Sequence, residues 1–282
     1  MFDMYLRTST LSFPGLGIGE FTIDSTAFTI FGHEIAWYGV IITFGIIISA
    51  IYGISRAKIE KISVDDMLDV ILVAVIISVI GARLYYVIFY GNYHSLYEII
   101  AIWNGGLAIY GAVIGGALAL LLMAKIKKLN ALKLLDIGAS SIILGQAIGR
   151  WGNFMNAEAY GYETMLPWRM GIHFSSGAIY VHPTFLYESL WNLLGFFLLW
   201  FIYKKKRYDG QIFLSYLAWY GFGRMFIEGL RTDSLWLIPD VIRVSQLLGG
   251  LCFAVCSALL VFFGVKFRKK NSTEVKTYGN QN

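Results

Sequence analysis

The chain has 282 residues, of which 57% are hydrophobic and only 15% are charged, and its net charge is +5. A soluble domain typically carries about 25% charged residues. This composition excludes a disordered chain, a coiled coil and a disulfide scaffold, and it argues against an ordinary cytoplasmic enzyme. The class that remains is a protein that crosses a membrane several times.

Seven apolar segments are long enough to cross a bilayer as helices, which takes about 20 residues each. They lie at residues 36–54, 67–90, 106–124, 134–150, 184–203, 211–228 and 241–265. The fourth is the weakest, because Asp136 and Gln146 interrupt it. The third is rich in glycine at small-xxx-small spacing, which predicts that helix backbones approach closely there. The sequence therefore predicts an all-α polytopic membrane protein with seven transmembrane helices.

Lysine and arginine gather in alternate connections, after the first, third, fifth and seventh segments. The positive-inside rule places these connections in the cytoplasm. We therefore expect the N-terminus outside and the C-terminus inside, with residues 266–282 as a cytoplasmic tail. The basic runs suit contacts with the anionic headgroups of membrane lipids, and no nucleic acid is needed to explain them.

The rest of the chain is expected to lie on the outer side. Residues 1–35 and 91–104 are predicted to form interfacial arms, the second with an amphipathic helix over residues 93–103. Residues 151–183 are too many for a simple connection. They are predicted to form a small extracytoplasmic head or lid, with a short hairpin around residues 175–177. The whole chain, 1–282, is expected to be one integral-membrane domain.

Three arginines lie near the outer ends of apolar segments: Arg83, Arg150 and Arg224. An arginine at mid-membrane costs roughly 2.5–3.5 kcal/mol on the insertion scale, and less near an interface. Arginine offers a rigid, planar fork of donors to phosphate or carboxylate. We interpret the outer side of the protein as built to hold an anion. The alternative is that these side chains snorkel to the interface.

A polar cluster at residues 149–158 ends the fourth segment. Arg150 and Asn153 are three residues apart and can share a face if the helix continues that far. With Asn156 and Glu158 they could grip a polar headgroup. The alternative is a polar helix cap followed by a loop.

A second polar stripe closes the sixth segment. Tyr220, Arg224, Glu228 and Arg231 fall on one helix face, so that Glu228 could hold both arginines. The stripe could also be a purely structural set of ion pairs. His182 opens the fifth segment as a cap or as a proton-handling group. The sequence shows no metal-ligand spacing, nucleotide motif or serine–histidine–acid arrangement.

The chain resembles the prolipoprotein diacylglyceryl transferases in five motifs that occur in the expected order. These are GARLYYVIFY at 81–90, GGLAIYG at 105–111, GRWGNFMNAE at 149–158, HPTFLYE at 182–188 and GRMFIEGLR at 223–231. The resemblance implies a bacterial plasma-membrane enzyme whose active site faces the outer leaflet. It would transfer diacylglyceryl from phosphatidylglycerol to the lipobox cysteine of a prolipoprotein and release glycerol 1-phosphate, the first step of lipoprotein maturation. It implies no metal and no organic cofactor.

The resemblance makes Arg150 the phosphatidylglycerol-binding arginine. The other positions that match the family's polar groups are Asn153, Asn156, Glu158, Arg224, Glu228, Arg231 and Tyr38. Two positions depart from the pattern. Some members have a histidine, proposed as the base, where Tyr110 stands, and Ala36 replaces a histidine two residues before Tyr38. A histidine-base mechanism is therefore in question for this chain.

Together these observations predict two sets of site residues. The predicted catalytic residues are Arg224, Glu228, Tyr110 and His182, and the predicted substrate-binding residues are Arg150, Asn153, Asn156, Glu158, Arg231, Arg83 and Tyr38. The base is left open between Tyr110, His182, Glu158 and no protein base.

Two other classes of protein compete with this hypothesis. A transporter or anion channel would show polar groups through the membrane depth and inverted repeats, and an outer-face acyltransferase would show a nucleophile pair. Here the polar residues crowd one side, and neither a repeat nor a nucleophile pair is evident.

Overall fold

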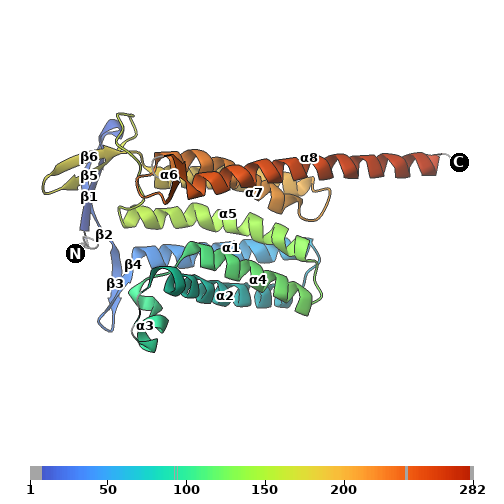
Figure 1. The fold of residues 1–282 in the computed structure, drawn as a ribbon, viewed down its shortest axis with the longest axis horizontal. Helices are drawn as coiled ribbons and strands as arrows, with labels where there is room; N and C mark the ends of the chain where they lie inside the picture. The colour runs from blue at the N-terminus through green and yellow to red at the C-terminus, as the bar shows by residue number, and fades with distance from the viewer. Residues whose placement is uncertain (1–7, 92, 94, 239–240, 280–282) are drawn as a thin grey trace. The chain divides into compact units, whose positions relative to one another are not determined.

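A computed structural model describes residues 8–91, 93, 95–238 and 241–279, with the side chains of these residues except 104 and 269–279. Residues 1–7 of the predicted N-terminal arm, 92 and 94 of the second arm and 280–282 of the predicted tail lie outside this description. Most of the described chain is helical (Figure 1). Its helices are α1 (Trp37–Ile59), α2 (Val64–Tyr90), α3 (Leu96–Ile100), α4 (Ile109–Ile126), α5 (Ala131–Met155), α6 (Thr184–Lys204), α7 (Gln211–Ile227) and α8 (Val244–Gly279).

Six of these helices are long and apolar enough to cross a membrane: α1, α2, α4, α5, α6 and the Val244–Arg268 part of α8. The chain is therefore a polytopic membrane protein. The sixth predicted segment is also a helix, α7, but it has 17 residues. At about 1.5 Å per residue, α7 is about 25 Å long, shorter than the roughly 30 Å hydrocarbon core.

The prediction of an all-α fold is wrong, because part of the chain forms β-strands. The strands are β1 (Thr8–Phe13), β2 (Ile18–Asp24), β3 (Thr26–Ile30), β4 (His33–Ala36), β5 (Met170–Phe174), β6 (Gly177–Val181), β7 (Trp236–Ile238) and β8 (Ile242–Arg243). Short 3₁₀ helices η1 (Pro14–Leu16), η2 (Ile102–Asn104) and η3 (Glu228–Leu230) join some of these elements. The largest sheet is antiparallel in the order β2-β1-β5-β6, and β3–β4 and β7–β8 are separate pairs.

The described part of the predicted N-terminal arm forms β-strands. Its segments are rich in threonine, isoleucine and phenylalanine, which favour a pleated, half-buried surface. Leu11 of β1 is fully buried and pairs with Phe21 of β2 and Ile172 of β5. The long-range pairing with β5 joins the β1–β2 pair to β5–β6 in one four-stranded sheet. The hairpin predicted in the head is confirmed as β5–β6, which turns at Gly177 with φ +136°.

The chain divides into two compact units, and each is described by itself. The first comprises Met1–Ser49 and Ala139–Asn282, and the second comprises Ala50–Gly138. In the first unit, aromatic rings join the sheet to the end of α5 and the start of α6. Phe154 lies 6.5 Å from Phe13 and 4.8 Å from Phe185 between ring centroids. The sheet therefore packs, through these rings, against the end of α5 and the start of α6.

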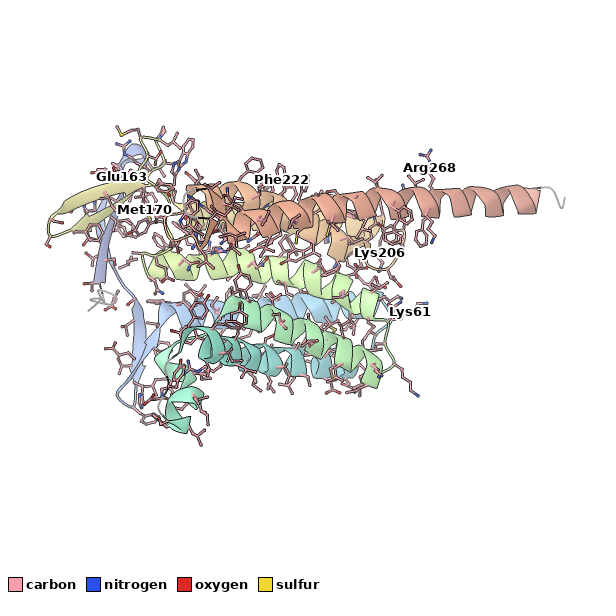
Figure 2. All side chains as sticks on the ribbon, in the orientation of Figure 1. Lys61, Glu163, Met170, Lys206, Phe222 and Arg268 are labelled. Atoms are coloured by element: carbon pink, nitrogen blue, oxygen red, sulfur yellow. The ribbon has the colours of Figure 1, made fainter. Side chains whose placement is uncertain are left out.

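Within the first unit, Lys206 and Arg268 lie at the end away from Met170 of β5 (Figure 2). Lys206 follows α6 in the connection to α7, and Arg268 lies on α8. The basic residues and the sheet therefore mark opposite ends of this helical unit.

In the second unit, α2 and α4 pack backbone to backbone, as the glycine spacing predicted. A Cβ at Gly81 would lie 2.5 Å from the carbonyl oxygen of Gly111, and one at Gly115 would lie 2.6 Å from that of Ile77. The predicted amphipathic helix of the second arm is shorter than expected, since α3 has five residues and η2 follows it. Leu96, at the start of α3, is exposed.

Candidate functional site

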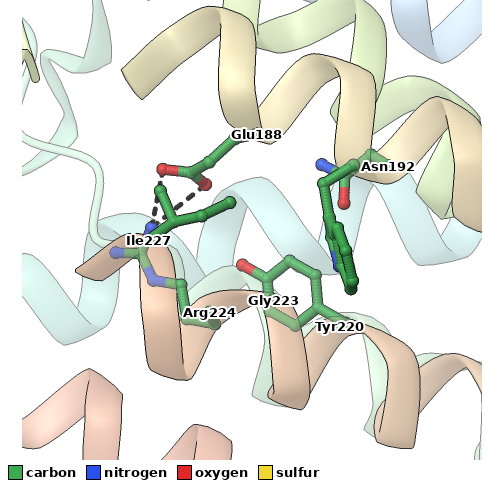
Figure 3. Close-up of a pocket in the computed structure, with 7 residues that line it drawn as sticks. Glu188, Asn192, Tyr220, Gly223, Arg224 and Ile227 are labelled. Atoms are coloured by element: carbon green, nitrogen blue, oxygen red, sulfur yellow. Dashed lines mark hydrogen bonds and ion pairs between the residues drawn. The ribbon is translucent and has the colours of Figure 1, made fainter. Parts of the chain in front are cut away.

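Arginines from three parts of the first unit converge on one buried carboxylate, Glu188, in the first turns of α6. Its side chain is 4% exposed. Arg224 Nη1 donates to both carboxylate oxygens, at 2.9 Å to Oε1 and 3.0 Å to Oε2 (Figure 3). Arg231 Nη1 donates to Oε1 at 3.2 Å, and Arg150 Nη2 forms an ion pair with Oε2. The ends of α5 and α7 and the segment after α7 are thus joined at a single acid.

Two further carboxylates hold these arginines from another side. Arg224 Nη2 lies 2.5 Å from Glu228 Oε2, and the side chain of Glu228 is 2% exposed. Arg231 forms a bidentate pair with Asp233, at 2.9 Å from Nε to Oδ1 and 2.7 Å from Nη2 to Oδ2. Glu228 therefore pairs with Arg224, whereas Arg231 contacts Glu188 and Asp233 instead. The α-helix ends at Ile227, so Arg231 leaves the helix face on which the sequence placed it.

These contacts shift two pKa values outside the membrane-spanning helices. Burial lowers the pKa of Arg231, but its hydrogen bond with Asp233 and the charges of Glu188 and Asp233 raise it above its ordinary value. Burial raises the pKa of Asp233, but the hydrogen bond and charge of Arg231 hold it below 3.8. Both groups are therefore charged at neutral pH.

The polar cluster at the end of α5 continues this network. The helix extends to Met155, so Arg150 and Asn153 do share a face, and Arg150 Nη1 donates to Asn153 Oδ1 at 3.3 Å. The amides of Asn153 and Asn156 both donate to Glu158 Oε1, at 3.0 and 3.2 Å. Arg150 is thus held between Glu188 and an amide that Glu158 orients.

A small pocket opens beside Glu188 and Arg224, between α6 and α7 (Figure 3). It is lined by Glu188, Trp191, Asn192, Tyr220, Gly223, Arg224 and Ile227. Its volume of about 10 Å³ is room for about one water molecule.

His182 and Tyr38 lie in the same unit as the network. Trp168 Nε1 donates to Tyr187 Oη at 2.8 Å, and this oxygen lies 3.2 Å from His182 Nδ1. Because an indole N–H can only donate, this arrangement favours a Tyr187 hydroxyl proton directed at His182 Nδ1. Burial lowers the pKa of His182, which favours the neutral imidazole at neutral pH. Tyr38 packs on α5, since a Cβ at Gly152 of that helix would lie 2.8 Å from the Tyr38 ring.

Arg83 and Tyr110 belong to the second unit. The Arg83 side chain is buried and donates to four main-chain carbonyls, at 2.6–2.9 Å, those of Glu98, Ile99, Gly105 and Gly106. These bonds tie the arm to α2 and engage most of the guanidinium donors. Tyr110 lies in the first turn of α4, with its ring centroid 6.1 Å from that of Tyr85. Their predicted roles toward substrate stay predictions.

The site residues predicted from the sequence do not include Glu188, although it lies in the motif HPTFLYE at 182–188. One signal could have found it. A carboxylate inside an otherwise apolar segment is costly in a membrane and marks a functional site by default. Asp233 has no such signal, because it lies in the loop that follows the polar stripe.

The guanidinium groups of this arrangement are donors of the kind that bind an anion. The acids of the network contact guanidinium groups. Among the residues that the structure describes, no group of three or more histidine, cysteine, aspartate or glutamate side chains gathers as metal ligands would.

Comparison with known proteins identifies the family. A family model described as prolipoprotein diacylglyceryl transferase matches residues 25–262. Proteins named phosphatidylglycerol–prolipoprotein diacylglyceryl transferase match at 44% identity in Listeria innocua, over 89% of this chain and 94% of the relative, and at 46% in Finegoldia magna, over 88% and 97%. The relative from Clostridioides difficile is 43% identical, over 81% of this chain and 93% of its own length. The chain therefore belongs to the prolipoprotein diacylglyceryl transferase family.

Proposed function

We propose that this transferase moves the diacylglyceryl group of phosphatidylglycerol to the thiol of a prolipoprotein's lipobox cysteine, forming a thioether and releasing glycerol 1-phosphate. Family membership decides against a transporter and an outer-face acyltransferase. The observation that carries the assignment of the site is the convergence of Arg150, Arg224 and Arg231 on Glu188. This is a preorganised set of donors of the kind that stabilises a departing phosphate.

The reaction is a displacement at a glycerol carbon. The thiol sulfur forms a bond to that carbon, the carbon–oxygen bond to the phosphate breaks, and its electron pair leaves with the phosphate oxygen. The thiol proton is taken up by a base or by the released phosphate. Negative charge grows on the phosphate in the transition state, so guanidinium groups aimed there lower the barrier in a site of low dielectric.

Arg150 is the arginine best placed to meet the lipid phosphate in the ground state. Its side chain is 21% exposed, against 17% for Arg224 and 11% for Arg231. In our proposal the phosphate takes over donors that Glu188 engages in the free enzyme. Arg224 and Arg231, held by Glu228 and Asp233, then contact the oxygens on which charge develops. Nearby guanidinium groups also favour the thiolate of the substrate cysteine.

We further propose that α7 completes a set of seven spans, with the N-terminus outside, the C-terminus inside and the arginine network at the outer leaflet of the bacterial plasma membrane. The support is the separation of Glu188, at the start of α6, from the lysines that end it. The lysine runs mark the cytoplasmic side by the positive-inside rule. Reporter fusions after Lys128 and after Lys205 should both report cytoplasm, and an external signal at either would contradict this topology.

A direct transfer assay tests the function. The purified full-length protein is mixed with phosphatidylglycerol labelled in its acyl chains and with a peptide that carries a lipobox. We expect label on the peptide, together with release of glycerol 1-phosphate. A matched peptide with serine in place of the cysteine should stay unlabelled. Label on the serine peptide would contradict thioether chemistry, and no label on the cysteine peptide would contradict the proposed function.

A further inference from the structure

Arg243 is a buried arginine outside the network, on the short strand β8. It is 5% exposed. Its Nη1 donates to the main-chain carbonyl of Glu228, and its Nη2 donates to Tyr162 Oη at 3.1 Å. The guanidinium carbon lies 4.6 Å from the ring centroid of Trp236. The motifs that led to the arginine network do not include Arg243.

The carbonyl of Glu228 is a point where several donors meet. It also accepts from the backbone N–H of Arg231 at 3.2 Å and from Ser234 Oγ at 3.3 Å. The last carbonyls of an α-helix lack partners within the helix, and the helix dipole favours a cation there. Arg243 therefore stabilises the turn that follows α7, from which the carboxylate of Glu228 reaches Arg224.

Tyr162 joins this turn to the loop that follows α5. The backbone N–H of Tyr162 donates to the carbonyl of Leu230 at 2.8 Å, and Thr232 N–H donates to the carbonyl of Tyr160 at 3.4 Å. The same loop contains Glu158, which holds the amide that contacts Arg150. One guanidinium thus contacts both the turn that follows α7 and the loop that follows α5.

We infer that Arg243 is a positioning residue for the transfer reaction, and this inference rests on the proposed role of the arginine network. Arg243 keeps the end of α7, with Arg224 and Glu228, in register with the loop that orients Arg150. A displacement of about 1 Å in a catalytic group can lower a rate about 100-fold. Lysine at position 243 cannot make both contacts, because a single ammonium lacks the planar fork that reaches the Glu228 carbonyl and the Tyr162 hydroxyl together.

The test compares Arg243→Lys with a matched control, Arg169→Lys. Arg169 also donates to a main-chain carbonyl, that of Met165 at 3.1 Å, and lies 5.2 Å from the ring of Tyr180, but it does not contact the network. We expect Arg243→Lys to lower kcat per folded molecule by about tenfold or more. KM for phosphatidylglycerol should change less than about twofold, because Arg150 is retained. Arg169→Lys should keep kcat.

A double variant shows whether Arg243 acts through Glu228. If it does, Arg243→Lys has little further effect on kcat in a Glu228→Gln background, since residues that act as a unit are non-additive. A full additional loss in the double variant would contradict this route. A wild-type kcat in Arg243→Lys would overturn the inference, and so would a loss confined to the yield of folded protein.

Two further variants keep the test decisive. Tyr162→Phe removes the hydroxyl that accepts from Arg243, and it is the deciding variant if Arg243→Lys does not fold. We expect kcat of Tyr162→Phe to fall at least about twofold, as for one lost hydrogen bond. An unchanged kcat in Tyr162→Phe would overturn the inference in that case. Arg224→Lys is measured in parallel. If it is fully active, the proposed network fails, whereas loss in Arg224→Lys with full activity in Arg243→Lys rejects only the role of Arg243.

Discussion

Trp191 of α6 and Trp219 of α7 form a reciprocal contact. Their rings are stacked, with centroids 4.1 Å apart and planes 9° from parallel. Trp191 Nε1 donates to the carbonyl of Trp219 at 3.1 Å, and Trp219 Nε1 donates to the carbonyl of Trp191 at 3.0 Å. Each indole lies over a glycine of the other helix, Gly223 beneath Trp191 and Gly195 beneath Trp219. This contact fixes the register of the two helices.

The contact predicts a compensating pair of substitutions. A methyl group at Gly223 would overlap the Trp191 indole, so Gly223→Ala should lower the free energy of unfolding by about 1–3 kcal/mol. Trp191→Phe removes the indole atoms at that point at the cost of one hydrogen bond, about 0.5–1.5 kcal/mol. The free energy of unfolding of the double variant should therefore fall by less than the sum of the two single losses. Denaturant unfolding of the purified protein measures this.

Gly264→Ala serves as the matched control for that pair. Gly264 lies on α8 with no other atom near the position of a Cβ, so alanine there should not destabilise the protein. Strictly additive losses in the double variant would contradict the steric account.

Arg150→Lys should lose most transfer activity although it keeps the charge. The fork that contacts both Glu188 and Asn153 is replaced by a single ammonium. A hydrogen bond to a charged group contributes about 1.5–3 kcal/mol, so we expect a fall of about 10- to 150-fold in kcat/KM for phosphatidylglycerol. A lysine variant with a near wild-type rate would refute phosphate binding by this residue.

Glu228→Gln should reduce kcat without moving the pH optimum. The amide keeps shape and hydrogen bonding but removes the charge that holds Arg224. Glu188→Gln should lose more activity, because Glu188 contacts three arginines rather than one. The measurement is the pH–rate profile of each variant. A large shift in the profile of Glu228→Gln would instead identify Glu228 as the base.

Tyr110→Phe should retain part of the activity. We propose that Tyr110 positions the thiol or the lipid by one hydrogen bond, which corresponds to a loss of about 2- to 13-fold. Tyr110→His should stay active, and label transfer to a lipobox peptide measures both variants. Complete loss in the phenylalanine variant with full rescue by histidine would show that position 110 handles the proton.

The pair of Arg231 and Asp233 predicts a pH-dependent part of the stability. The pKa of Asp233 lies below 3.8 in the folded protein, because the hydrogen bond and charge of Arg231 outweigh the effect of burial. Its contribution is therefore present above pH 3.8 and is lost as the pH falls through the folded-state pKa. Asp233→Asn should be less stable than the wild type near neutral pH, and the difference should shrink at acid pH. A constant difference across this range would contradict the assignment.

Several features of the protein could be predicted because they depend on local sequence. Apolar runs determine where membrane helices lie, so the starts of α6 and α7, at Thr184 and Gln211, agree with the predicted segments. The spacing of Gly111 and Gly115 allowed a close backbone approach of α4 to another helix to be anticipated, but not that α2 is the partner. The three-residue spacing of Arg150 and Asn153 required only that α5 continue, and it does.

Only the tertiary structure decided which groups meet. Arg83 and Arg224 look alike in the sequence, each near the end of an apolar segment, yet Arg83 contacts backbone carbonyls and Arg224 contacts two acids. Strand β1 pairs with its neighbour β2 on one edge, but its partner on the other edge is β5, some 160 residues later in the chain. The partner of a guanidinium or of a strand edge is set by long-range packing, which local residue patterns do not encode.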